Sequence, residues 1–172
     1  SGTVVIPSSV ESVGNGAFAS SGITSLDLSG ATGLTSIDDA AFRNSGITSL
    51  DLSGATGLKS IGGYAFQECT ALSGPLTIPP TVVSIDDAAF RNSGITSLVL
   101  TEATGLTSIG NNAFNGCRQL SGTLTIPPSV VSVGNSAFRN ATLDKIIVPL
   151  FLWDTRTVVS GWAAGFPQQK IE

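Results

Sequence analysis

The sequence predicts an α/β repeat solenoid of about seven turns, with short parallel strands on one face and short helical turns on the other. Phenylalanine recurs six times at a constant 24-residue interval, at Phe18, Phe42, Phe66, Phe90, Phe114 and Phe138. Three further apolar series keep the same interval, and they are Val13, Ile37, Ile61, Ile85, Ile109 and Val133; Val10, Leu34, Leu58, Val82, Leu106 and Val130; and Val4, Leu28, Leu52, Leu76, Leu100 and Leu124. A single turn cannot bury its apolar edge alone, so its stability must come from stacking on neighbouring turns.

Each turn opens with an L-x-L or L-x-I segment, in which apolar and polar residues alternate. This alternation predicts a short strand with its apolar side facing inward. One kind of turn reads L-D-L-S-G-A-T-G-L, at 26–34 and again at 50–58, and the other reads L-T-I-P-P-T-V at 76–82 and L-T-I-P-P-S-V at 124–130. Glycine or Pro-Pro ends the strand, and two apolar residues three apart then supply a second apolar edge to the core.

The A-F segment closes each turn, as in D-D-A-A-F-R-N at 38–44. We expect it to form one short helical turn that ends at Asn or Gly. The phenylalanine would fill the space between the two sides and pack against those of the turns above and below. The Asp38-Asp39 and Asp86-Asp87 pairs would then lie at the positive end of a helix dipole, within reach of Arg43 and Arg91. One such pair supplies too few oxygen ligands for a divalent cation.

The motif L-x-I-P-x-x-V-x-x-I-G-x-x-A-F-x-x-C-x-x-L resembles the BspA-type leucine-rich repeats of bacterial and protist surface proteins, and the similarity covers roughly residues 3–149. The best match runs over 124–143, with Ala141 where the family often has Cys; Cys69 and Cys117 occupy that place in their own turns. The resemblance implies a leucine-rich-repeat solenoid over 1–149 and an extracellular or cell-surface location. It also implies a C-terminal capping segment over 150–172, which contains both tryptophans. The first turn begins without a cap, so we expect the chain to be a fragment of a longer array. We expect it either to be a monomer or to associate end to end.

Cys69 and Cys117 are separated by two full turns of the repeat. At about 4.8 Å per rung their Cα atoms would lie about 10 Å apart, whereas a disulfide tolerates at most about 7 Å. We therefore expect two free, buried thiols that act as small apolar core residues.

Composition excludes several classes of function. Only eight residues are Lys or Arg and the net charge is −4, so we expect no nucleic-acid partner. No apolar run reaches the ~20 residues that membrane insertion needs. The chain contains no histidine and no phosphate-binding glycine loop, so we expect neither an enzyme nor a cofactor or metal site.

The strand face is the remaining candidate for function. One residue per turn lies between the inward leucines, and this row is Asp27, Asp51, Thr77, Val99 and Thr125. We expect a non-catalytic binding or adhesion module that presents this row to a protein or glycan ligand. Two alternatives are a structural spacer in a longer cell-surface array and an ice- or surface-binding repeat, although Asp27 and Asp51 interrupt any threonine array. The row also lacks Tyr, Trp and Arg, the usual hot-spot residues, and its small residues fit a merely soluble sheet surface equally well.

Overall fold

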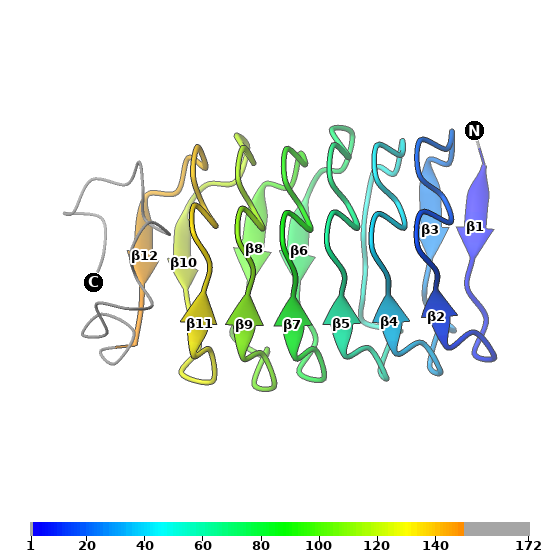
Figure 1. The fold of residues 1–172 in the computed structure, drawn as a ribbon, viewed down its shortest axis with the longest axis horizontal. Coiled ribbons are helices and arrows are strands. Elements are labelled where there is room, and N and C mark those ends of the chain that lie inside the picture. The colour runs from blue at the N-terminus through cyan, green and yellow to red at the C-terminus, as the bar shows by residue number, and fades with distance from the viewer. Residues whose placement is uncertain (1, 150–172) are drawn as a thin grey trace.

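The computed structural model describes residues 2–149, which form an elongated solenoid of about six turns, where about seven were predicted, with the first and last rungs at opposite ends (Figure 1). Strands lie on two faces, which we call the leucine face and the serine face. Residues 2–149 contain no helix, so the predicted helical turns are wrong, whereas the stacked parallel strands are confirmed. Nothing in this part of the chain is a helix long and apolar enough to cross a membrane. The expected capping segment, 150–172, lies outside the described residues.

The serine face is a continuous six-stranded parallel sheet in the order β11-β9-β7-β5-β4-β2. Its strands are β2 (Ser12–Val13), β4 (Ser36–Ile37), β5 (Ser60–Ile61), β7 (Ser84–Ile85), β9 (Ser108–Ile109) and β11 (Ser132–Val133). Every pair is in register at the 24-residue interval, as Ile37 with Ile61. Each strand directs its Ile or Val into the core and its serine outward. The sequence predicted only an apolar edge here and missed the sheet.

The leucine face is built from three separate two-stranded parallel sheets. They are β1 (Thr3–Val5) with β3 (Ser25–Asp27), β6 (Pro75–Thr77) with β8 (Ser97–Val99), and β10 (Thr123–Thr125) with β12 (Lys145–Ile147). Val4 lies opposite Leu26, not Leu28, so the predicted 24-residue alignment is wrong on this face. The physical reason is the different length of the two kinds of turn, because the segment from Val4 to Phe18 is shorter than the segment from Leu26 to Phe42.

The A-F segments form a chain of tight turns in place of helices. The residues two before and two after Phe42, Ala40 and Asn44, have φ of 54° and 53°, in the left-handed region that a right-handed helix excludes. The Phe42 N–H donates to the Ala65 carbonyl of the next rung at 2.8 Å, whereas the Arg43 N–H donates within its own rung to Ala40. Because every second N–H finds an acceptor on the neighbouring rung, stacking supplies the hydrogen bonds that a helix would otherwise provide.

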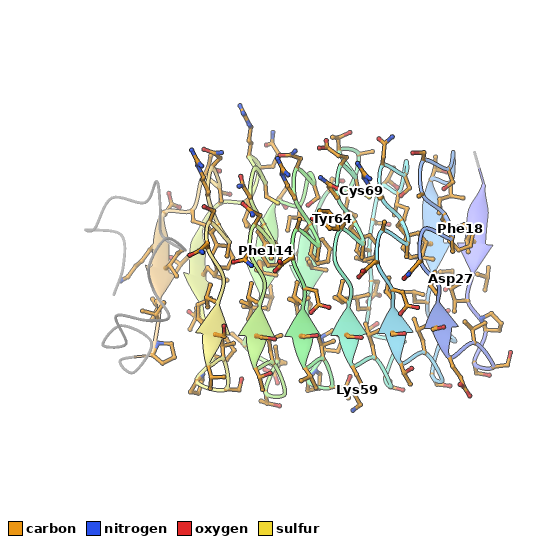
Figure 2. All side chains as sticks on the ribbon, viewed as in Figure 1. Phe18, Asp27, Lys59, Tyr64, Cys69 and Phe114 are labelled. Carbon is orange, nitrogen blue, oxygen red and sulfur yellow. The ribbon has the colours of Figure 1, made fainter. Side chains whose placement is uncertain are left out.

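The phenylalanines form one continuous stack through the core, as predicted. Neighbouring rings lie 5.1–5.4 Å apart between centroids and are nearly parallel, with interplanar angles of 1–11°. Phe114 is fully buried within this stack, whereas Phe18, in the first described rung, is only partly buried (Figure 2). Stacked aromatic pairs contribute about 0.5–1.5 kcal/mol each beyond their burial, so the stack is a principal link between rungs.

Candidate binding surface

The structure places all five predicted residues on the leucine face. Asp27, Thr77, Val99 and Thr125 are the last residues of β3, β6, β8 and β10, and Asp51 lies at the corresponding place in a segment that is not a strand. Thr77 and Val99 are direct neighbours across a strand pair. The same row continues in Val5, opposite Asp27, and Ile147, opposite Thr125. Sequence reasoning missed these two, although V-V-I at 4–6 and I-I-V at 146–148 repeat the strand pattern.

A hollow of about 520 Å³ opens on this face between the rung that contains Leu50 and the rung that contains Thr77. Its apolar lining residues are Leu50, Leu52, Pro75, Ile78, Pro79 and Pro80. Its polar lining residues are Asp51, Ser53, Thr56, Thr77, Thr81 and Glu102. The hollow therefore brings Asp51 and Thr77 together and leaves Asp27, Val99 and Thr125 outside. We call it the leucine-face hollow.

The hollow forms where strand pairing is interrupted. Leu76 follows Leu50 after 26 residues, whereas Leu50 follows Leu26 after 24, because C-T-A-L-S-G-P-L at 69–76 is longer than the return of the preceding turn. Leu124 follows Leu98 at the same 26-residue interval. Residues 48–52 are assigned to no strand and lie between β3 and β6 (Figure 1). Pro75, which opens β6, has no N–H to donate. Within residues 2–149, the main-chain N–H and C=O groups of Leu50 and Asp51 make no hydrogen bond.

Two carboxylates give the hollow a negative character. The Asp51 Oδ1 accepts the Ser53 N–H at 2.9 Å, and this backbone bond, with a second from the Ser53 side chain, lowers the pKa of Asp51 below 3.8. Glu102 is the other acidic lining residue, and no Lys or Arg lines the hollow. The Thr81 hydroxyl is buried and has no hydrogen-bond partner in the described chain. The surface is thus apolar, acidic and free of aromatic rings.

A second hollow, on the serine face, is lined by Asp39, Gly63, Asp87 and Asn111 among others, and it lies where a side-chain ladder has a gap. One Asn or Asp per rung accepts the N–H of the same position in the next rung: Asn15 from Asp39 at 3.1 Å, and Asp39 from Gly63 at 2.7 Å. Gly63 has no side chain to continue the series, and Asp87 resumes it by accepting the Asn111 N–H at 2.6 Å. The carboxylates of Asp39 and Asp87 therefore link rungs, and the expected role at a helix dipole is wrong because there is no helix. Among residues 2–149, no group of three or more Cys, Asp and Glu residues could hold a metal ion.

Both cysteines are free and buried, as predicted. The Cys69 thiol donates to the Phe42 carbonyl at 3.1 Å, and the Cys117 thiol donates to the Phe90 carbonyl at 3.0 Å. Burial raises the pKa of both thiols, that of Cys117 to about 11. A protonated, buried thiol is a poor nucleophile, so these residues act in packing.

Comparison with known proteins supports the repeat architecture. The model of the BspA-type leucine-rich-repeat region matches residues 2–121 and 35–154, with six copies. A T. pallidum leucine-rich-repeat protein of known structure is 23% identical with a TM-score of 0.55, over 87% of this chain and 59% of that one.

Two further structures are similar at lower scores. The pneumococcal vaccine antigen PcpA is 15% identical with a TM-score of 0.44, over 85% of this chain and 62% of that one. A leucine-rich cell surface protein from Faecalibacterium prausnitzii is 20% identical with a TM-score of 0.39, over 86% and 53%. The chain thus spans less than two thirds of each structure. The sequence has no match among curated proteins.

Proposed function

Because the chain belongs to the BspA-type leucine-rich-repeat family, we propose that it is a non-catalytic module that binds a ligand at the cell surface or in the extracellular space. The observation that supports this proposal is the leucine-face hollow, which has apolar and acidic lining residues. Its volume lies within the roughly 300–1,000 Å³ of typical ligand sites. The extracellular location rests on the resemblance to surface proteins.

The architecture fits this role because a solenoid offers repeated, rigid positions for ligand contacts. Within residues 2–149, segment 48–52 is the one rung of the leucine face without a strand, and it supplies an irregular place on an otherwise repetitive surface. Asp51 and Thr77 come from different rungs, so a ligand in the hollow would contact two turns at once. The alternative role, a structural spacer, requires no such site.

Filling the hollow is the direct test. Thr77 is exposed and lines the hollow, so Thr77→Trp would occupy it with little effect on the core. Thr125→Trp is the matched control, because Thr125 is also exposed, stands in the same L-T-I-P-P context and lies outside the hollow. The full chain and both variants would be applied to a glycan array and to a phage-displayed library of random seven-residue peptides.

We expect the wild type and Thr125→Trp to retain the same ligands and Thr77→Trp to lose them. Circular dichroism and thermal melting would establish that all three proteins are folded. Retention of nothing by the wild type would favour the spacer role and overturn the proposal. Equal loss in both variants would also contradict a site at the hollow.

A further inference from the structure

The chemistry of the leucine-face hollow specifies the class of ligand more narrowly, and this inference rests on the proposed function. We infer that the hollow binds an extended peptide segment that carries a bulky aliphatic side chain next to a lysine or arginine. Three features support this choice: the apolar lining, the unpaired main chain of residues 50–51, and the two carboxylates.

The apolar lining selects an aliphatic group over a sugar. Pro75 and Pro80 are exposed and Pro79 is half-buried, so three proline rings offer hydrocarbon surface without N–H donors. Leu50, Leu52 and Ile78 lie buried beneath them as the floor of the hollow. A sugar could bond to the polar lining residues, but it would set its remaining hydroxyl groups against the proline rings, which offer no hydrogen-bond partner, and this is costly. An aliphatic side chain has no polar group to satisfy and gains from leaving water.

The main chain beside the hollow favours a peptide over a small apolar molecule. The N–H and C=O groups of Leu50 and Asp51 are unpaired in the described chain, and both residues line the hollow. Strand-like segments with free main-chain groups bind extended peptides through backbone hydrogen bonds, while pockets select the side chains. Paired strands such as β6 and β8 have already used these groups on their shared edge.

The charge of the hollow selects the neighbouring residue of the peptide. Asp51 and Glu102 line it from different rungs, and no basic residue lines it. Ser53 bonds to the Asp51 carboxylate, but a carboxylate can accept about four hydrogen bonds, so it can still receive a cation. Lysine or arginine beside the aliphatic residue would complement both carboxylates.

Peptide selection followed by charge removal would test this inference. The full chain would select binders from the phage-displayed random peptide library, and one enriched peptide would be synthesised for fluorescence titration. We expect enrichment of Leu, Ile or Val next to Lys or Arg. Affinity should fall about fivefold in the double variant Asp51→Asn with Glu102→Gln, since exposed charge pairs contribute modestly. High salt should reduce wild-type affinity similarly.

Asp27→Asn is the matched control for charge removal. Asp27 stands in an identical nine-residue segment and makes the same bond to its own serine, Ser29, but lies outside the hollow. We expect this variant to keep wild-type affinity. Selected peptides without basic residues, or equal affinity in the double variant, would overturn the inference. Glycan binding that Thr77→Trp abolishes would also overturn it while leaving the proposed function intact.

Discussion

Two segments with identical sequence, 26–34 and 50–58, have different structures and surfaces. In the first, Leu26 and Asp27 belong to β3, which pairs with β1. In the second, Leu50 and Asp51 belong to no strand and line the hollow. The local turns are nonetheless alike, because Asp27 accepts from Ser29 and Asp51 accepts from Ser53, both at 2.9 Å.

The difference between the copies comes from their neighbours. β3 follows β1 at a 22-residue interval and pairs with it, whereas β6 follows the second copy at a longer, 26-residue interval and does not. The rung on either side thus decides whether this sequence becomes a paired strand or one wall of a hollow. In a repeat protein, a change in the length of one turn creates a site without any change in the residues beside it.

The largest expected effect is the loss of unfolding free energy when a core leucine is truncated. It should be the same in both copies, because Leu28 and Leu52 lie in one core. Leu28 and Leu52 are 2% and 1% exposed. Replacing either by alanine should cost about 3 kcal/mol of unfolding free energy, within the range for buried leucines. Urea denaturation of both variants measures this cost, and we expect values that agree within about 1 kcal/mol.

A clear inequality would change the interpretation of the hollow. If Leu52→Ala cost much less than Leu28→Ala, the hollow would reach into the core and Leu52 would be only loosely packed. Ser29→Ala and Ser53→Ala, at exposed positions in the two copies, provide controls that should change stability by less than about 0.5 kcal/mol.

The next largest expected effect is the change in stability on replacing the glycine at the fifth position of each copy, Gly30 or Gly54, and it should differ between the copies. A Cβ at Gly54 would collide with the Leu28 carbonyl oxygen and lie 2.6 Å from the Ser29 Cα, whereas a Cβ at Gly30 meets nothing within 4 Å. Gly54→Ala should therefore cost about 1–3 kcal/mol through backbone displacement. Gly30→Ala should be neutral or stabilise the protein by up to about 1 kcal/mol, because it restricts the unfolded chain.

Thermal unfolding of the two glycine variants separates these outcomes. Each variant has the same sequence change in the same nine-residue context, so intrinsic propensity cancels between them. Equal costs would indicate that the second copy does not pack against the first as closely as the structure shows. A larger cost at Gly30 would contradict the order of the rungs.

The sequence predicted the features that recur at the 24-residue period. It missed the strands and backbone conformations that depend on hydrogen bonds between stacked rungs. The interval of the phenylalanines was enough to predict the ring stack and the separation of Cys69 from Cys117. The serine strands were missed because two residues are too few for alternation to be visible. The left-handed φ values of Tyr64 and Glu68, 59° and 60°, have no signal in residue type, since neither residue favours that conformation. They depend on hydrogen bonds to the adjacent rung.

The hollow was missed for a different reason. Asp51 and Thr77 were predicted as members of a regular row, but nothing in that row distinguished them from Asp27, Val99 and Thr125. The distinguishing signal is that the strand position of Leu50 lies 24 residues after that of Leu26 and 26 before that of Leu76, whereas every paired strand of this face has its partner 22 residues away. Aligning all turns at the constant interval of the phenylalanines concealed it, because that alignment placed Leu52 in the series that contains Leu76.

The smallest expected effect concerns the acidic residue of each copy. The pKa of Asp27 is lowered by side-chain and backbone hydrogen bonds from Ser29, and that of Asp51 by backbone and side-chain bonds from Ser53. Carboxylates with lowered pKa contribute stability above the unfolded value of 3.8, and this contribution is lost as the pH falls through the folded value. Asp27→Asn and Asp51→Asn should therefore be slightly less stable than wild type near neutral pH, with the deficit vanishing in acid.

Carboxyl-carbon NMR titration with urea unfolding across the acidic range measures both parts of this prediction. The two copies should titrate alike, both below 3.8, because each carboxylate accepts the same bonds. A higher midpoint for Asp51 alone would show that Glu102 lies close enough to repel it. A peptide with a cation in the hollow should then lower that midpoint and leave Asp27 unchanged, because only Asp51 would gain a positive neighbour.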